Sequence, residues 1–151
     1  MTKYWGPCTW YLFHTLAEKI LVEKFDNIKD SFLDIILRCC NNLPCPDCSM
    51  HAKQQLSSLN RSSIKTKDDL KLMLHSFHNI VNNRLNKPQF STDELNNKYK
   101  LANTTNIVRH FIQIWGKPSH NPKLMTEDLH KSRVVKDFIN WWNINNINFE
   151  K

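Results

Sequence analysis

The chain has 151 residues, a length that suits one domain with a core of its own. Apolar residues make up 40% of the chain and charged residues 23%, a balance typical of globular proteins. Only two glycines occur, which argues against turn-dense all-β folds and against a Gly-rich phosphate loop. The net charge of +7 comes from Lys and Arg residues scattered along the chain, so it favours a solubilising surface over a nucleic-acid groove.

The spacing of apolar residues predicts helices along almost the whole chain and no convincing pair of strands. Thr66, with Asp69 three residues later, indicates a helix N-cap with an acidic partner. Residues 116–122 hold both Pro and Gly and indicate a linker. The expected helices are, in chain order, 7–24, 27–43, 46–59, 67–86, 92–101, 104–115 and 126–143.

No stretch of the chain approaches the roughly 18 apolar residues that span a bilayer. The first residues do not lead into the apolar region of a signal peptide, so we expect a cytosolic protein without membrane contact. Five cysteines occur in the first third of the chain: Cys8, Cys39, Cys40, Cys45 and Cys48. An odd number of cysteines in a cytosolic protein argues against a disulfide-stapled fold and favours catalytic or metal-binding cysteines.

The pair Cys45-Pro-Asp-Cys48 carries the clearest chemical signal. Two cysteines three residues apart at the start of a helix place their sulfurs close enough for a disulfide, and the helix N-terminus favours the thiolate that thiol–disulfide exchange requires. The alternative is a metal-binding module built from Cys45, Cys48, His51 and one of Cys39 or Cys40. A structural zinc site usually has a second Cys pair or two closely spaced His residues, so the pattern favours redox chemistry and no metal.

Two other pairs of residues are spaced one helical turn apart. Trp10 and His14 share one helix face, and so do His78 and Asn82 on another helix. Each pair alone is typical of a core residue beside a satisfied polar group. Together with Lys87, they supply stacking surfaces, amide donors and a cation between two helices. A dinucleotide bound in a helical bundle would need these groups, since the chain has no Rossmann fingerprint.

Three segments carry more specific patterns. They are Gly6-Pro-Cys-Thr-Trp10-Tyr-Leu-Phe-His14, Leu43-Pro-Cys45-Pro-Asp-Cys48 and Phe77-His78-Asn79-Ile-Val81-Asn82-Asn-Arg-Leu-Asn-Lys87-Pro. In order and spacing they resemble the flavin-linked sulfhydryl oxidases of the Erv/ALR type, across residues 5–101. The resemblance implies an all-α fold, a four-helix bundle with a short fifth helix that binds FAD in its mouth. It implies an FAD-binding domain over 1–102, which leaves 103–151 as a C-terminal helical extension.

The resemblance also implies a role for each matching residue. Cys48 would face the flavin, with its thiolate against the isoalloxazine ring, and Cys45 would be the exposed sulfur that exchanges with substrate. Electrons would pass from a substrate dithiol through Cys45 and Cys48 to the flavin and then to oxygen, giving hydrogen peroxide. The residues implied to bind FAD are Gly6, Thr9, Trp10, His14, His78, Asn79, Val81, Asn82, Leu85, Lys87, Lys98 and Tyr99.

The chain departs from cellular members of that family, because it has neither a cysteine after Cys48 nor a shuttle cysteine pair near a terminus. Its pattern is most similar to the versions of large cytoplasmic DNA viruses. That likeness implies a location in the host cytoplasm or virion and a thioredoxin-like or other dithiol protein as substrate. Family pairing through the outer faces of the first helices implies a homodimer, unless the C-terminal tryptophans cover the same patch. The apolar residues of this patch include Tyr4, Leu12 and Val22.

Two interpretations from other classes stay open, the metal-binding module and a basic helical domain that binds nucleic acid. A bound flavin would make the purified protein yellow, whereas zinc or nucleic acid would not. Cys8, Cys39 and Cys40 are interpreted as small buried hydrophobic residues, with an electron relay through Cys8 or Cys40 as the alternative.

Overall fold

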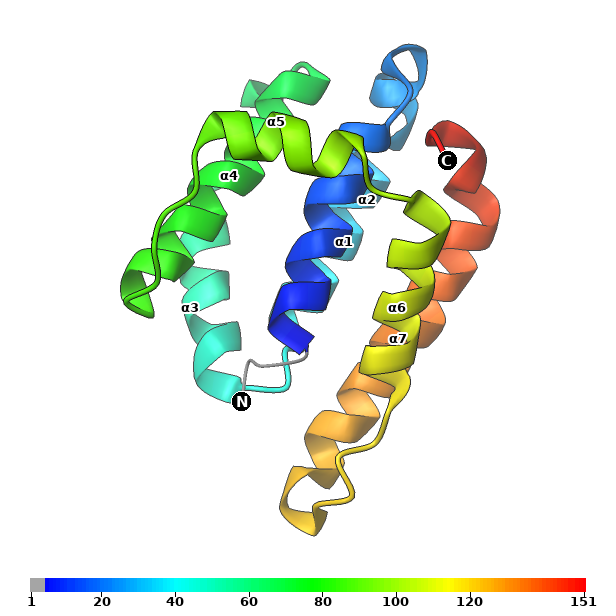
Figure 1. Cartoon of the computed structure of the whole chain (residues 1–151). Coiled ribbons are helices and arrows are strands. Elements are labelled where there is room, and N and C mark those ends of the chain that lie inside the picture. Colours follow the sequence, from blue (N-terminus) through cyan, green and yellow to red (C-terminus); the bar gives the residue numbers. More distant parts are fainter. Residues whose placement is uncertain (1–4) are drawn as a thin grey trace.

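The computed structural model describes residues 5–151, and this part of the chain is helical, with one isolated β-bridge between Ile20 and Phe149 (Figure 1). The all-α prediction is therefore confirmed, and every expected segment contains a helix. The helices are α1 (Trp5–Lys19), α2 (Phe25–Asn41), α3 (Pro46–Leu56), α4 (Lys67–Arg84), α5 (Thr92–Lys100), α6 (Thr104–Gly116) and α7 (Met125–Asn145). Short 3₁₀ turns lie at Val22–Lys24, Arg61–Ser63, Pro122–Leu124 and Asn146–Asn148.

Side-chain caps determine where α3 and α4 begin. Cys45 is the N-cap of α3, and its Sγ accepts the N–H of Cys48 at 3.3 Å, with Pro46 in the first turn. Thr66 and Asp69 form the predicted cap of α4. The Asp69 N–H donates to Thr66 Oγ1 at 3.1 Å, and the Thr66 N–H donates to the Asp69 carboxylate at 3.0 Å. The two cysteines thus occupy the first turn of a helix with a defined start.

Helix α1 ends earlier than the predicted range of 7–24. The carbonyl of Lys19 accepts the N–H of Glu150 at 2.6 Å, and the N–H of Leu21 donates to the carbonyl of Asn148 at 2.9 Å. These backbone groups would continue the helix, but the C-terminal tail takes them instead, and Leu21 is extended. The end of α1 therefore depends on a partner that is remote in the sequence.

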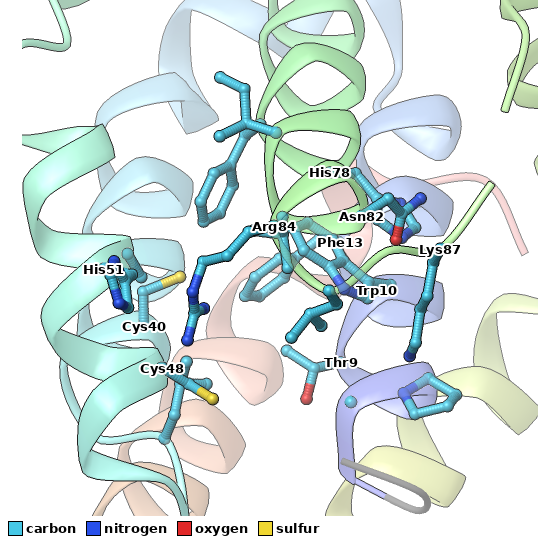
Figure 2. A pocket seen from close by; sticks show the side chains of 18 of the residues that line it. Thr9, Trp10, Phe13, Cys40, Cys48, His51, His78, Asn82, Arg84 and Lys87 are labelled. Carbon is cyan, nitrogen blue, oxygen red and sulfur yellow. The ribbon is translucent and has the colours of Figure 1, made fainter. Parts of the chain in front are cut away.

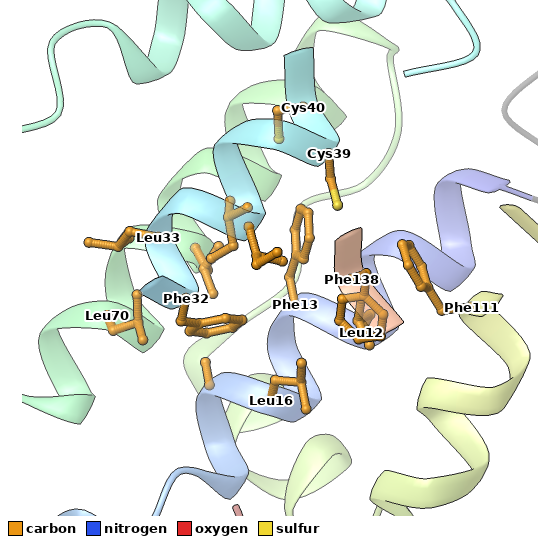
Figure 3. Packing of buried hydrophobic residues seen from close by; sticks show 14 of the residues in the cluster. Leu12, Phe13, Leu16, Phe32, Leu33, Cys39, Cys40, Leu70, Phe111 and Phe138 are labelled. Atoms are coloured by element: carbon orange, nitrogen blue, oxygen red, sulfur yellow. The ribbon is translucent and has the colours of Figure 1, made fainter. Parts of the chain in front are cut away.

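Helix α1 is the central element of the fold. It packs against α4 and α5 on one side and against α6 on the other, while α2 packs against α3 (Figure 1). In the interior, Phe13 and Leu16 of α1 lie among Phe32 of α2 and Leu70 of α4 (Figure 3). Each of these four side chains is at most 1% exposed. The position of α1 is thus fixed by packing against α4 and α5, and that of α3 by packing against α2.

Helices α6 and α7 form a hairpin that covers the side of α1 away from α4 (Figure 1). Phe111 of α6 and Phe138 of α7 are fully buried, with ring centroids 5.0 Å apart, and they lie beside Leu12 of α1 (Figure 3). One buried cluster therefore runs from the bundle into the predicted C-terminal extension. Leu12, expected in an exposed patch, is fully buried because α6 covers it.

Two hydrogen bonds join the hairpin to the bundle through tryptophans. The Trp115 Nε1–H donates to Thr9 Oγ1 at 2.8 Å, and the Trp141 Nε1–H donates to Ser31 Oγ at 3.1 Å. Both bonds satisfy indole N–H donors that would otherwise be buried without an acceptor. The hairpin is therefore attached by directed contacts as well as by apolar packing.

Two large apolar side chains at helical positions are exposed. Ile80 of α4 is 46% exposed and Leu129 of α7 is 56% exposed. Ile80 lines the cavity described below. Leu129 lies in the first turns of α7, at the hairpin tip, which projects past the N-terminal end of α1 (Figure 1). Val22 is exposed as expected, and Tyr4 lies outside the described residues. Across residues 5–151 no helix has the length and apolar character to cross a membrane.

Candidate active site

The two cysteines at the start of α3 form a disulfide, with their Cα atoms 5.2 Å apart. The N–H of Ser49 donates to the carbonyl of Cys45 at 3.0 Å, and the hydroxyl of Ser49 accepts the N–H of Leu43 at 2.9 Å. These bonds tie the segment before α3 to the first turn of the helix. Hydrogen bonds of the surrounding backbone therefore fix the positions of Cys45 and Cys48 in addition to the disulfide.

A cavity of about 280 Å³ lies beside this disulfide (Figure 2). Its volume is close to the lower end of the range for small-molecule sites, roughly 300–1,000 Å³. Cys48 lines the cavity, whereas Cys45 does not. The disulfide thus presents one sulfur to the cavity and the other outside it, which is the arrangement needed to connect an external thiol with a group in the cavity.

Stacked rings form one wall of the cavity. The rings of Trp10 and His78 lie 3.9 Å apart with an angle of 8° between their planes. His14 Nε2 and His78 Nδ1 are 2.9 Å apart and share a hydrogen bond. The ring of Tyr99 stacks on that of His14 at 4.8 Å between centroids. These rings connect α1, α4 and α5 around the cavity.

His14 and His78 are both neutral at pH 7. Burial lowers the pKa of His14 well below the ordinary 6.5, and neighbouring His78 acts in the same direction. Burial lowers the pKa of His78 to about 4, with a further contribution from the charge of Lys98. Their shared hydrogen bond requires one ring nitrogen to donate and the other to accept, which neutral rings can do.

Every charged group on the cavity wall is a cation. Arg84, Lys87 and Lys98 line the cavity, and no Asp or Glu does so among the described residues. The Lys98 Nζ also lies 4.7 Å from the ring centroid of Tyr11. The cavity therefore favours a ligand that is both aromatic and anionic.

Most of the residues implied to bind FAD line the cavity: Gly6, Thr9, Trp10, His78, Val81, Asn82, Leu85, Lys87, Lys98 and Tyr99. Two of them do not reach it. His14 lies behind His78 and orients that ring through the shared hydrogen bond. Asn79 holds the chain after α4, since its amide donates to the Phe90 carbonyl at 3.1 Å and its Oδ1 accepts the Phe90 N–H at 3.1 Å.

Four titratable side chains that line the cavity lie outside the set implied to bind FAD: Tyr11, Cys40, His51 and Arg84, of which Figure 2 labels the last three. His51 follows Cys48 by three residues, and the sequence names it only as a ligand of the alternative metal-binding module. Arg84 lies within the third motif, but only the fold shows that its side chain extends toward α3 (Figure 2). Cys40 reaches the cavity because α2 packs against α3.

The three cysteines outside the pair are free and buried. Burial raises the pKa of Cys8 to about 11 and that of Cys40 to about 12, and it also raises the pKa of Cys39. Neutral thiols are poor nucleophiles, so small buried hydrophobic residues describe them better than an electron relay does. In the described part of the chain, no group of three or more His, Cys, Asp or Glu side chains is placed to hold a metal ion.

The comparisons with known proteins agree on one family. The model of the Erv1 / Alr family matches residues 7–100. An FAD-linked sulfhydryl oxidase of African swine fever virus, from a Namibian warthog isolate, is 34% identical over 99 residues, which are 64% of this chain and 81% of that protein. The protein of the same name from a Malawian tick isolate of that virus is 32% identical over 117 residues, 74% of this chain and 96% of that protein. No solved structure is significantly similar to the chain.

The matched region begins in α1 and ends in α5, so it contains the disulfide and most of the cavity wall. The three motifs quoted from the sequence fall on α1, on the start of α3 and on the end of α4. The hairpin of α6 and α7 lies beyond the match. Because the family model covers more than half of the chain and its motifs meet around one cavity, the chain belongs to the Erv1 / Alr family.

Proposed function

We propose that this chain is an FAD-dependent thiol oxidase, which forms disulfides in substrate proteins through Cys45 and Cys48 and passes the electrons to oxygen, giving hydrogen peroxide. The asymmetric disulfide is the observation that carries this proposal. Cys48 lines a cavity walled by stacked rings and cations, while Cys45 lies outside that cavity. The two viral relatives bear the name FAD-linked sulfhydryl oxidase, which supports the same activity here.

The cavity residues fit FAD. Its flat rings need stacking partners, which Trp10 and His78 offer. Its diphosphate needs cations, and Lys87 and Lys98 line the cavity without a carboxylate among the described lining residues. The amide of Asn82, which donates to the Pro88 carbonyl at 3.3 Å, holds the turn that carries Lys87. When bound, FAD would accept two electrons from the reduced cysteine pair and transfer them to oxygen.

The cysteine pair would perform the exchange with substrate. A substrate thiolate attacks Cys45 Sγ, the bond to Cys48 breaks, and the electron pair of that bond leaves on Cys48 Sγ. The second substrate thiolate attacks the substrate sulfur of the mixed disulfide and displaces Cys45. The Cys48 N–H and the N-terminus of α3 then stabilise the negative charge on Cys45. The substrate gains a disulfide, and its two electrons remain on Cys45 and Cys48.

The likeness to African swine fever virus proteins supports a place in the disulfide-forming pathway of a large cytoplasmic DNA virus. In this proposal the enzyme acts in the host cytoplasm or the virion. Its substrate is a thioredoxin-like or other dithiol protein that can bring a thiolate to Cys45.

The homodimer predicted from the sequence stays a prediction. The hairpin covers the outer face of α1 that was expected to form it, and a pair using this face would have to separate Trp115 from Thr9. Sedimentation equilibrium over a concentration series tests the point. A dimeric mass would support the dimer and would show that the chain pairs through a face that the hairpin leaves open, whereas a monomeric mass would contradict it.

The test of the proposed function is oxygen consumption by the purified full chain with a reduced thioredoxin as dithiol substrate. We expect a yellow protein that consumes oxygen and releases one peroxide for each disulfide formed. Cys45→Ser and Cys48→Ser should reduce turnover to the uncatalysed rate, whereas Cys8→Ala, at a buried cysteine outside the pair, should keep it. A colourless protein, or a Cys45→Ser variant with wild-type turnover, would overturn the proposal. Bound zinc or nucleic acid in a colourless preparation would favour the other two interpretations.

A further inference from the structure

Arg84 lines the cavity from α4, whereas the disulfide lies at the start of α3. It is the last residue of α4, and its side chain extends toward α3, with the guanidinium on the side where Cys48 and His51 lie (Figure 2). Within residues 5–151, Arg84 makes no salt bridge. Its positive charge is therefore not neutralised by a carboxylate and is available to an anion in the cavity.

The other charged groups of the cavity are placed differently. Lys87 stands on the far wall, beside Trp10 and away from Cys48 (Figure 2), and the Lys98 Nζ lies over the ring of Tyr11. Asp47 neighbours Cys48 in the sequence but is exposed and does not line the cavity. Of the three cations that line the cavity, Arg84 is thus the one whose side chain is directed toward Cys48 (Figure 2).

The titratable groups on the cavity wall come from all five helices of the bundle. They are Tyr11 from α1, Cys40 from α2, Cys48 and His51 from α3, His78 and Arg84 from α4, Lys87 after α4, and Lys98 and Tyr99 from α5.

We propose that Arg84 is a positioning residue that stabilises the thiolate of Cys48 when the Cys45–Cys48 bond opens. The two sulfurs would then be served by different elements of the fold. The N-terminus of α3 and the Cys48 N–H act on Cys45, while the guanidinium at the end of α4 acts on Cys48. This division follows from the geometry, since Cys45 Sγ takes the N-cap position and Cys48 faces the cavity.

The chemical consequence concerns the leaving group of the exchange. When a substrate thiolate bonds to Cys45 Sγ, the electron pair of the old disulfide moves to Cys48 Sγ, and no proton is needed if that anion is stabilised. A leaving thiol of lower pKa leaves faster, so Arg84 speeds the opening of the disulfide. Arg84 also keeps Cys48 ionised afterwards, the state in which it can donate electrons. Both consequences rest on the proposed function, whereas the stabilised thiolate does not.

The expected size follows from the exposure of Arg84. An opposite charge within about 4–6 Å lowers a pKa by roughly 1–3 units. Arg84 is exposed to solvent, so we expect the low end of that range, about one unit, and a weakening as salt screens the charge. Loss of the cation would reduce the thiolate fraction of Cys48 about tenfold at a pH below its pKa.

The test measures ionisation of Cys48 directly, in the flavin-loaded, full-length Cys45→Ser protein. Iodoacetamide alkylates thiolates, and the rate at Cys48 is followed by peptide mass spectrometry over a pH series. Cys8, Cys39 and Cys40 should react slowly because burial keeps them neutral. The same titration is repeated with Arg84→Gln, with Arg84→Lys, and with Lys53→Gln. Lys53 is an exposed cation of α3 that does not line the cavity, which makes it the matched control.

We expect Arg84→Gln to raise the pKa of Cys48 by about one unit. Arg84→Lys keeps a cation and should raise this pKa much less, and Lys53→Gln should leave it unchanged. In the Cys45→Ser protein with Arg84 intact, added salt should raise the pKa of Cys48. An unchanged pKa in Arg84→Gln would overturn the inference, and so would an equal rise in Lys53→Gln. If Cys48 titrates alike in all variants while the wild-type chain still oxidises dithiols, the inference about Arg84 fails and the proposed function stands.

Discussion

The bundle of α1–α5 and the hairpin of α6 and α7 share one hydrophobic cluster, yet they bury different kinds of side chain. The bundle buries polar groups in its interior, among them His14, Thr15 and Asn82. In the hairpin the buried polar side chains are those of Thr104, at the start of α6, and Lys131 of α7. Burying a polar group is costly unless it is hydrogen-bonded, so the bundle carries most of this cost while the hairpin contributes mainly apolar packing.

The two regions nevertheless meet at the site. Thr9 lines the cavity, and its Oγ1 accepts a hydrogen bond from the indole N–H of Trp115 in the hairpin. The N-terminal half of α1 is therefore held between the cavity and the hairpin. A change in the hairpin should alter stability first and flavin binding only through Thr9, whereas a change in the cavity wall should do the reverse.

The largest expected effect is on stability, from Phe111→Ala in the hairpin. Phe111 is fully buried against Phe138, so the substitution leaves a cavity and should lower the free energy of unfolding by about 3–5 kcal/mol. Urea denaturation measures this loss, and the folded fraction should keep its flavin. Leu129→Ala, at an exposed position of α7, is the control and should change the free energy by less than about 0.5 kcal/mol. Loss of flavin from folded Phe111→Ala would contradict the claim that the hairpin affects stability and not flavin binding.

The same residue type in the two regions should give opposite results. Trp10→Ala removes a stacking wall of the cavity, worth about 1 kcal/mol beyond the buried area, so flavin affinity should fall at least about fivefold. Trp142→Ala removes a half-buried ring of the hairpin that lies near Phe138 and Phe149. It should lower the denaturation midpoint and leave flavin affinity unchanged. Absorbance of bound flavin during titration with FAD decides, and equal affinity in both variants would contradict the proposed pocket.

A smaller effect is expected where the regions join. Trp115→Phe keeps most of the buried ring but loses the hydrogen bond to Thr9 Oγ1, at a cost of about 1 kcal/mol. Thr9→Val removes the other partner. In a double-mutant cycle the two losses should not add, because each variant already breaks the same bond. Fully additive losses would show that this bond does not couple the hairpin to α1.

A further prediction concerns pH. The pKa of His78 is about 4 in the folded protein against an ordinary 6.5, so between these values the unfolded chain binds more protons than the folded one. Stability from this group is present above about pH 6.5 and declines as the pH falls toward 4. The lowered pKa of His14 adds to the decline. Urea denaturation at a series of pH values should show a smaller acid loss in His78→Gln than in the wild type, and an unchanged slope would contradict the assignment.

Features set by local chemistry could be predicted from the sequence. The helices follow from apolar spacing, and the start of α4 follows from Thr66 and Asp69, whose side chains act within one turn. Features set by remote partners could not. The early end of α1 depends on hydrogen bonds with the C-terminal tail, and the burial of Leu12 depends on α6.

The same distinction applies to the site. The cysteine pair and most of the cavity wall lie in contiguous motifs, so spacing and family likeness could locate them. The direction of the Arg84 side chain and the entry of Cys40 into the cavity depend on how α2, α3 and α4 pack together. The position of His14 behind His78, instead of on the cavity surface, likewise needs the fold.

The central claim, that electrons leave a dithiol through Cys45 and Cys48 and reach a flavin in this cavity, has one direct measurement. Excess reduced dithiol is added to the purified flavin-loaded protein without oxygen, and the visible absorbance of the flavin is followed in time. We predict rapid bleaching in the wild type, bleaching no faster than that of free FAD in Cys45→Ser and Cys48→Ser, and recovery of the wild-type colour when oxygen is admitted. Bleaching of either cysteine variant at the wild-type rate would contradict the claim.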